Sequence, residues 1–228
     1  MKDIVIIGCG GFGREVAWLI EEINNVNQEW NILGFIDDDT LNHGQIINGY
    51  AVLGGFEYLK EKKNIYYVCA VGSAKSRRKI VEEKCSKYNI IPATLVHPSV
   101  LMNKKNVCIG EGSIVCASNI LTVNINVGKH TLINLDCTIG HDVIIEDYVT
   151  IYPSVNISGN CKVALCSELG TGTHIIQGKN IGKRTIIGAG TVVIRDIGDN
   201  CVAVGNPARV IKVMEDIYEK DIIRNNSK

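Results

Sequence analysis

Residues 133–168 read INLDCT IGHDVI IEDYVT IYPSVN ISGNCK VALCSE, six consecutive blocks of six residues that each begin with Ile or Val. The period continues on both sides, because every sixth residue from Ile109 to Val193 is aliphatic, until Asp199 ends the series. An α-helix does not produce this pattern, since six is not a multiple of its 3.6 residues per turn. A half-buried strand would instead alternate with a period of two. The repeat therefore predicts a parallel β-helix, with the aliphatic residues pointing inward.

The residues that follow each aliphatic position suit a tight corner. Glycine comes directly after it in six blocks, and the residue four places on is mostly small or β-branched, as at Ser113, Thr131 and Val143. This hexapeptide repeat resembles that of the left-handed β-helix acyltransferases, whose prism has three faces. The resemblance implies left-handed winding, with three blocks to each coil and five complete coils that no loop interrupts.

Ahead of the repeat, the chain alternates predicted strands and helices. Such alternation is typical of a small parallel sheet of Rossmann type. The predicted elements are a strand at 2–8, a helix from Arg14 to Ile20, strands at 32–36 and 65–71, and a helix over roughly 75–88.

The sequence thus divides into three regions. A Rossmann-like α/β domain is predicted at 1–92, a β-helix at 93–204 and a C-terminal region at 205–228. In the last region Gly205-Asn206-Pro207-Ala208-Arg209 predicts a turn. The charged segment from Met214 to Arg224 predicts a short helix.

The first glycines, Gly8-Cys9-Gly10-Gly11-Phe12-Gly13, match the GxGxxG pattern, and Asp37 follows at the distance of a ribose-binding carboxylate. This pattern leaves three interpretations open: a nicotinamide dinucleotide site, a site for a smaller nucleotide such as the nucleoside diphosphate of an activated sugar, or a fold without a ligand. About 90 residues precede the coils, which leaves no room for the second mononucleotide-binding half of a dinucleotide fold. A nucleotide-sugar site is therefore the favoured interpretation.

Composition argues against a nucleic-acid-binding, membrane-bound or secreted protein. Lys and Arg number 24 and Asp and Glu number 24, so no charge excess favours nucleic acid or an anionic membrane as a partner. The nine cysteines form no CxxC pair, and Met1-Lys-Asp leads into only four apolar residues before Gly8, which does not fit a secretory leader. No apolar run approaches the length of a membrane span. We therefore expect a reduced, cytoplasmic protein.

Among the five histidines, His141 is best placed for chemistry. It lies two residues after Ile139, at a corner of a coil, and Asp142 follows it directly. Histidine serves as a general base near neutral pH, and a neighbouring carboxylate fixes its tautomer. The other four histidines are expected to have no chemical role: His43 and His97 as structural residues, His130 and His174 on a solvated surface.

Several motifs together resemble one enzyme family. Residues 3–13, the FIDDD segment at 35–39, Gly-His-Asp at 140–142, Ile157-Ser158-Gly159 and the GNPAR turn occur in this order in the sialic acid O-acetyltransferases and the related nucleotide-amino-sugar N-acetyltransferases, such as those of bacillosamine and perosamine. The resemblance implies direct acetyl transfer from acetyl-CoA without a metal, with His141 as general base and Asp142 as its support. It also implies a homotrimer that binds CoA between neighbouring prisms.

Further site residues follow by position from this resemblance. The residues expected to contact CoA are Ser158, Gly159, Thr150, Thr171, Ala189 and Arg209, with Lys212 beside the last. The residues expected to contact the acceptor are Gly10, Gly11, Phe12, Asp37, Asp38, Gly72 and Asn134.

The predicted function is acetylation of an amino or hydroxyl group on a sugar, expected to be nucleotide-linked, in surface-glycan biosynthesis. Three alternatives stay open at this point: a β-helix metalloenzyme of the carbonic anhydrase type, a nicotinamide-dependent oxidoreductase, and a scaffold without catalysis. The first needs three converging histidines, which the spacing of His130, His141 and His174 does not suggest. The second gives the coils no role.

Overall fold

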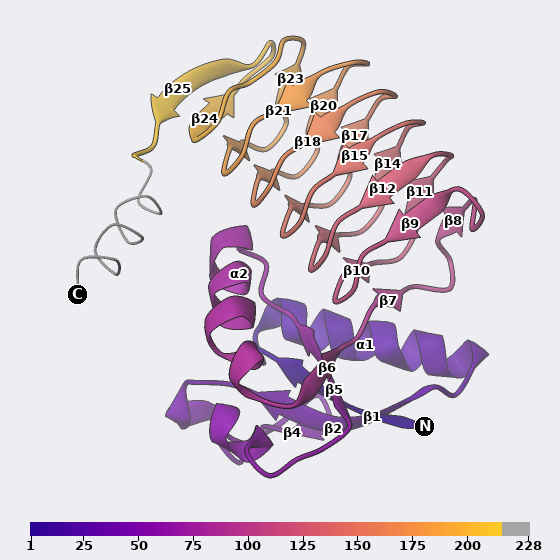
Figure 1. The fold of residues 1–228 in the computed structure, drawn as a ribbon, viewed down its shortest axis with the longest axis vertical. Helices are drawn as coiled ribbons and strands as arrows, with labels where there is room; N and C mark the ends of the chain where they lie inside the picture. The colour runs from indigo at the N-terminus through magenta and orange to yellow at the C-terminus, as the bar shows by residue number, and fades with distance from the viewer. Residues whose placement is uncertain (216–228) are drawn as a thin grey trace.

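The computed structural model describes residues 1–215 as two stacked units, an α/β unit followed by a stack of β coils (Figure 1). Apart from its first two residues, the helix predicted from Met214 to Arg224 lies outside the described residues. Directly after the GNPAR turn the chain forms a strand, β25 (Arg209–Val213), which pairs antiparallel with β24 (Cys201–Val204).

The α/β unit is built on a four-stranded sheet in the order β2-β1-β5-β6, all parallel. Its helix α1 is longer at both ends than predicted, and β6 was not predicted. The elements are β1 (Lys2–Ile7), α1 (Gly11–Val26), β2 (Trp30–Ile36), η1 (Thr40–Asn42), β3 (Ile46–Ile47), β4 (Tyr50–Ala51), η2 (Phe56–Leu59), β5 (Ile65–Cys69), α2 (Ala74–Glu83), η3 (Cys85–Lys87) and β6 (Ile90–Pro92).

The coils form three sheets, parallel except for the terminal strand β25, here called face 1, face 2 and face 3 in the order in which the chain meets them. Each strand pairs with the strand three blocks further on, as Leu132 does with Thr150. Face 1 holds β7 (Leu95–Val96), β10 (Ile114–Val115), β13 (Leu132–Ile133), β16 (Thr150–Ile151), β19 (Glu168–Leu169), β22 (Ile186–Ile187), β24 and β25. Face 2 holds β8 (Leu101–Met102), β11 (Ile120–Leu121), β14 (Thr138–Ile139), β17 (Asn156–Ile157), β20 (His174–Ile175) and β23 (Val192–Val193); face 3 holds β9 (Val107–Ile109), β12 (Ile125–Val127), β15 (Ile144–Ile145), β18 (Lys162–Val163) and β21 (Asn180–Ile181).

The β-helix is thus confirmed, and it contains one coil more than expected. Leu95 pairs with Ile114, an interval one position longer than the regular one that separates Val107 from its partner Ile125. One additional residue in the turn at 103–106 therefore shifts the first coil out of the six-residue series. From Ile109 onward the first residue of each block lies in the shared interior, which forms one continuous apolar core.

Each corner has the same backbone geometry. The fourth residue of every block from Gly112 to Gly190 has a positive φ, a conformation that Gly, Asn and Asp adopt most readily. Asp142 is one of these residues, with φ of 58°. At the corner between faces 3 and 1 the position is also held by bulkier residues, among them His130 and Tyr148.

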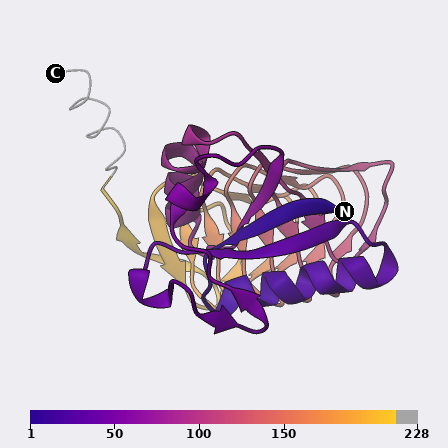
Figure 2. The ribbon, with the colours of Figure 1, turned by 90° about the horizontal axis from the view of Figure 1, so that it is seen from below.

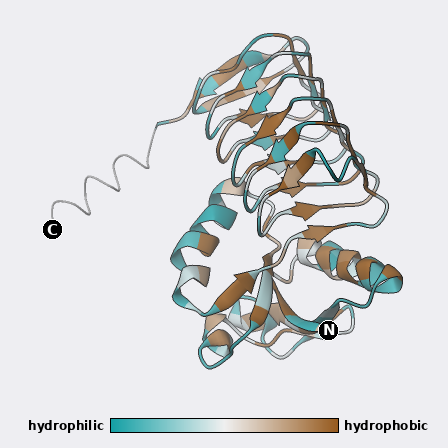
Figure 3. Cartoon of the chain, turned by 45° about the vertical axis from the view of Figure 1, so that its right-hand side comes forward, coloured by the Kyte–Doolittle hydropathy of each residue, from teal (hydrophilic) through white to brown (hydrophobic). Residues whose placement is uncertain are grey.

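The α/β unit covers one face of the prism. Outward side chains of face 1 that would otherwise meet water, such as Leu95, Ile114 and Leu132, are at most 1% exposed because they pack in one cluster with α1 and β1. Seen from below, α1 runs across the end of the coils (Figure 2), and the ribbon of its hydrophobic residues is brown in Figure 3. Equivalent positions on faces 2 and 3, such as Ile120 and Ile144, remain exposed.

Arg77 of α2 joins the two units. Its side chain is buried, and its guanidinium donates hydrogen bonds of 2.8 Å to 3.0 Å to the carbonyl oxygens of His130, Tyr148 and Val149 in the coils. The same group donates to the carbonyl of Gly72 over 3.0 Å. The loop that carries Gly72 is therefore held against face 1.

The prediction that His130 lies on a solvated surface was wrong. Its ring is buried and stacked between Tyr67 and Tyr148, and burial lowers its pKa to about 4. The hexad pattern places His130 at a corner, and only the docking of the α/β unit covers that corner. His174 is exposed, as expected.

Candidate active site

His141 and Asp142 form a hydrogen-bonded pair at the corner between faces 2 and 3. Nδ1 of His141 lies 2.8 Å from Oδ2 of Asp142, and the two side chains are 50% and 45% exposed. Because a carboxylate only accepts hydrogen bonds, this contact places the ring proton on Nδ1 and leaves the Nε2 lone pair free. The hydrogen bonds from His141 and Asn124 hold the pKa of Asp142 below its ordinary value, so the group stays ionised.

The imidazole of His141 lies against Gly159, one coil further on. A Cβ atom built on Gly159 would overlap Nε2 of the ring, and the residue is buried. Glycine is therefore required here by space, and its backbone is not in the left-handed region. The contact places the basic nitrogen of the ring next to the Gly159 backbone.

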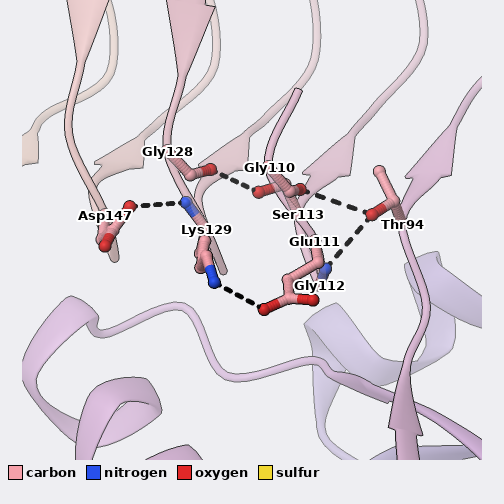
Figure 4. A network of polar contacts seen from close by, with 8 residues as sticks. All are labelled: Thr94, Gly110, Glu111, Gly112, Ser113, Gly128, Lys129 and Asp147. Carbon is pink, nitrogen blue, oxygen red and sulfur yellow. Dashed lines mark hydrogen bonds and ion pairs between the residues drawn. The ribbon is translucent and has the colours of Figure 1, made fainter. Parts of the chain in front are cut away.

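The backbone N–H of Gly159 has no hydrogen-bond acceptor among residues 1–215. The equivalent N–H at the corner between faces 3 and 1 is satisfied: Oδ1 of Asp147 accepts from the N–H of Lys129 over 2.7 Å, beside an ion pair between Lys129 and Glu111 (Figure 4). Oδ1 of Asp199 accepts from the N–H of Lys183 in the same way. The Gly159 N–H at the His141 corner therefore has no acceptor within the described protein, whereas the equivalent N–H at the corner between faces 3 and 1 is already hydrogen-bonded to a carboxylate.

Gly159→Ala is expected to lower kcat about 100-fold while leaving the protein folded, because the new methyl group must displace the His141 ring. Steady-state kinetics combined with thermal melting measures both effects. Gly198→Ala is the matched control, since a Cβ there meets nothing within 4 Å. Wild-type kcat in Gly159→Ala would contradict the assigned ring position.

The other residues expected to contact CoA are spread over the prism. Ser158 is exposed at the corner of His141, and Arg209 is exposed on β25. Thr171 and Ala189 are exposed at the corner between faces 1 and 2, at equivalent positions of adjacent coils. The contact of all four with CoA stays a prediction.

Thr150 is placed differently from the expectation. It has no exposed surface, and its hydroxyl donates to the carbonyl of Gly72 over 2.7 Å and accepts from Arg77 at 2.9 Å. Its outward position on face 1 is covered by the α/β unit. In this arrangement Thr150 holds the two units together and presents no surface to CoA.

The glycine loop at residues 8–13 packs closely against the sheet of the α/β unit. A Cβ on Gly13 would overlap the carbonyl oxygen of Gly8, so these glycines allow α1 to pack closely on β1. Gly10 and Gly11 are exposed at the start of α1, and Phe12 packs partly into the core beneath.

The carboxylate of Asp37 already has partners. Its Oδ2 accepts from the N–H and the thiol of Cys9, both at 3.0 Å, and its Oδ1 accepts from the N–H of Asp39. Burial acts to raise the pKa of Asp37, but the hydrogen bonds from Cys9 and Asp39 outweigh it and lower the pKa. Asp37 thus shapes the glycine loop, and a ribose hydroxyl would have to compete for its oxygens. Asp38 is exposed and pairs with Lys84.

Asn134 lies at a corner of face 1 and is almost buried. Its Oδ1 accepts from the N–H of Leu135 over 2.7 Å, and its carbonyl accepts from Nδ2 of Asn119. These contacts are those of a structural asparagine between coils, so its contact with an acceptor stays a prediction.

One chain does not bring the predicted acceptor residues and His141 together. Gly72 is bonded to Thr150 on face 1, whereas His141 lies at the corner between faces 2 and 3. In a three-faced prism that corner is opposite face 1. The body of the coils therefore separates the two groups within one subunit.

Two of the remaining histidines have hydrogen-bond partners of their own. Nε2 of His43 lies 2.8 Å from the carbonyl of Asp37, and His97 is buried with Nδ1 accepting from Ser99, which fits structural roles. Over residues 1–215, no three His, Cys, Asp or Glu side chains are grouped to hold a metal ion. In the same range, no helix has the length and apolar character needed to cross a bilayer.

One residue of this corner, Asn124, was not predicted. It lies one coil before Asp142 and donates from Nδ2 to Oδ1 of Asp142 over 3.0 Å. The signal was present in the repeat, because residues three blocks apart are stacked at the same corner.

The chain is similar to known acetyltransferases in both of its units. Residues 3–84 match the PglD N-terminal domain family. The acetyltransferase domain of PglB from Neisseria gonorrhoeae, solved with acetyl coenzyme A, is 27% identical, with a TM-score of 0.82 over 92% of this chain and 99% of that chain. A histidine-to-asparagine variant of perosamine N-acetyltransferase from Caulobacter crescentus, solved with CoA and GDP-perosamine, is 26% identical, with a TM-score of 0.83 over 93% and 98%. WeeI from Acinetobacter baumannii is 30% identical, with a TM-score of 0.80 over 92% and 100%.

The curated relatives match over a shorter stretch. The chain spans 28%, 33% and 56% of the length of three of them, all called acetyltransferases. The likeness to complete solved chains is therefore the broader of the two.

Proposed function

The chain belongs to the hexapeptide-repeat family of sugar N-acetyltransferases, and from this we propose that it transfers an acetyl group from acetyl-CoA to an amino or hydroxyl group of a nucleotide-linked sugar. The observation that carries the proposal is the exposed His141–Asp142 pair, whose free ring nitrogen lies beside the unpartnered N–H of Gly159. A base and a donor side by side are what transfer from a thioester requires.

The proposed mechanism uses no covalent enzyme intermediate. Nε2 of His141 takes the proton of the acceptor amine or hydroxyl as its nitrogen or oxygen attacks the acetyl carbon. The N–H of Gly159 donates to the acyl oxygen as negative charge develops there. The carbon–sulfur bond then breaks, and the protonated ring returns a proton to the thiolate of CoA. Asp142 remains ionised throughout and stabilises the charged ring.

A nucleotide-linked sugar is the proposed acceptor class. The perosamine N-acetyltransferase that 93% of this chain resembles was solved with GDP-perosamine, a nucleotide-linked sugar. In this chain the loop at Gly10 and Gly11 exposes backbone at the start of α1, a position suited to phosphate groups. We further propose a role in surface-glycan synthesis in the cytoplasm.

We propose that three copies assemble, with the site between neighbours. The exposed Thr171 and Ala189 lie at one edge of face 2 and His141 at the other, so one prism does not present both edges to one ligand. A neighbouring prism supplies the missing edge in a closed ring. Light scattering is expected to give three times the chain mass of 24.9 kDa. A fully active monomer would contradict this arrangement.

An acceptor panel tests the function. Nucleotide-linked amino sugars and hydroxy sugars are incubated with acetyl-CoA, and the release of free thiol is followed for the wild type and His141→Ala. Thiol release that depends on both an acceptor and His141 is expected. If no acceptor of the panel stimulates release above hydrolysis, the proposed function fails.

A further inference from the structure

The carboxylate of Asp142 is held from both sides. Its Oδ2 faces Nδ1 of His141 at 2.8 Å, and its Oδ1 accepts from Nδ2 of Asn124 over 3.0 Å. We propose that Asn124 is a positioning residue for the general base, which fixes the plane of the Asp142 carboxylate and thereby the tautomer and direction of the His141 ring. This inference rests on the proposed function.

The repeat explains why Asn124 reaches Asp142. Both occupy the fourth position of a block, in adjacent coils, with φ of 55° and 58°. The N–H of Asp142 donates to the carbonyl of Val123 over 3.1 Å, so the two backbones are stacked in register. Two side chains that leave the same backbone conformation in adjacent coils are parallel, which places the amide of Asn124 beside one oxygen of Asp142.

The backbone of the next coil completes the arrangement. The N–H of Asn160, again at the fourth position, donates to the carbonyl of His141 over 2.8 Å. His141 is therefore fixed at its backbone by Asn160, at its ring edge by Asp142 and against its Nε2 by Gly159. Only the carboxylate of Asp142 would be free to rotate, and Asn124 restrains it.

The hydrogen bond from Asn124 matters because the His141–Asp142 pair is exposed to solvent. Exposed ion pairs are weak, since each side chain loses rotamer freedom to hold one geometry. Asp142 is 45% exposed, so its single contact with His141 would compete with solvent. A second hydrogen bond to a charged oxygen is stronger than a neutral one and orders the carboxylate before substrate arrives.

The chain contains a matched control. Asn180 donates from Nδ2 to Oδ2 of Asp196 over 3.1 Å, an exposed Asn–Asp pair on the same edge of the prism but at least two coils beyond His141. Loss of that bond removes an exposed Asn–Asp hydrogen bond from the coils without changing the contacts of His141.

Three variants test the proposal kinetically: Asn124→Ala, Asn124→Asp and Asn180→Ala. Asn124→Ala is expected to lower kcat about 10-fold with KM for acetyl-CoA unchanged, by analogy with outer-shell partners of other sites. Asn124→Asp keeps the shape but places a like charge beside Asp142, so a larger loss is expected at about pH 8. Its rate relative to wild type should recover toward about pH 6, where a proton shared by the two carboxylates restores a donor. Asn180→Ala should stay within about twofold of wild type.

The tautomer of His141 provides a readout that does not depend on acetyl transfer. Nitrogen-15 NMR of the wild type should show the proton on Nδ1, and Asn124→Ala should show a mixture of the two tautomers. An unchanged tautomer together with wild-type kcat in Asn124→Ala would overturn the proposal, as would an equal loss in Asn180→Ala. If the wild type acetylates no acceptor, the proposed function fails, while the NMR result still decides the role of Asn124.

Discussion

His141→Ala is expected to lower kcat for acetyl transfer by a factor of about 10²–10⁴, the usual contribution of a positioned general base. The structure places Nε2 of this ring beside Gly159 with its proton held on the opposite nitrogen by Asp142. Removing the ring takes away the proton acceptor while leaving the surrounding corner intact. The side chain is half exposed, so the free energy of unfolding should change little. Thiol release under saturating acetyl-CoA and acceptor measures the effect.

His174→Ala is the matched control for this experiment. His174 is also an exposed histidine of the coils, on face 2, and no hydrogen bond links it to a carboxylate within residues 1–215. Its loss should leave kcat within about twofold of wild type. If His141→Ala retains more than about a tenth of the wild-type rate, a general base at this position is excluded as the main source of catalysis.

Arg77→Met is expected to lower the free energy of unfolding by about 3–5 kcal/mol, the range for removing one member of a buried charged network. The guanidinium is 1% exposed and serves carbonyl oxygens of both units. Methionine has a similar length but no donor, so the carbonyl oxygens of His130 and Tyr148 lose their hydrogen bonds, at about 1–3 kcal/mol for each one left unsatisfied. The carbonyl oxygens of Gly72 and Val149 keep a second donor, the Thr150 hydroxyl and the Leu132 N–H. Urea unfolding followed by circular dichroism measures the change.

Lys79→Met is the control on the same helix, because Lys79 is exposed on α2. Its substitution should change the free energy of unfolding by no more than about 0.5 kcal/mol. Since Arg77 also holds the carbonyl of Gly72, the KM for the acceptor should rise in any folded Arg77 variant. Wild-type stability in Arg77→Met would show that the joint between the units does not depend on this side chain.

The β-helix was predictable because its pattern is local. Each inward position from Ile109 to Val193 must be aliphatic to fill a narrow interior, and that demand recurs at a fixed interval. The first coil was not predicted, because the additional residue in the turn at 103–106 breaks the interval while leaving the strand pairing intact. Counting along the sequence detects only a constant interval, whereas the pairing of strands tolerates a turn that is one residue longer.

The His141–Asp142 pair was predictable for a similar reason. The two residues are adjacent in sequence, and the corner geometry that turns Asp142 back toward the ring belongs to every block. The stacking of Gly159 on His141 followed from the coil of three blocks. Asn124 was predictable in the same way, because it lies three blocks before Asp142 and therefore at the same corner.

The burial of Thr150 and His130 could not be predicted from the six-residue repeat. Both occupy ordinary outward or corner positions of the repeat, yet both are buried because the α/β unit docks on face 1, with Tyr67 of β5 against His130 and Arg77 of α2 against Thr150. Which of three equivalent faces is covered depends on side chains far apart in sequence, such as Arg77 and the coil carbonyls it binds.

By itself, the sequence determined the coiled strands, the α/β unit before them and the histidine–carboxylate pair at a corner, since each is written in residues that are adjacent or regularly spaced. Only the tertiary structure decided which face the α/β unit covers, that Thr150 and Asp37 are already bonded within the protein, and that the loop of Gly72 lies opposite the corner of His141. The physical reason is that a repeat makes its faces locally alike. The choice among them is made by long-range packing and by buried hydrogen bonds such as those of Arg77.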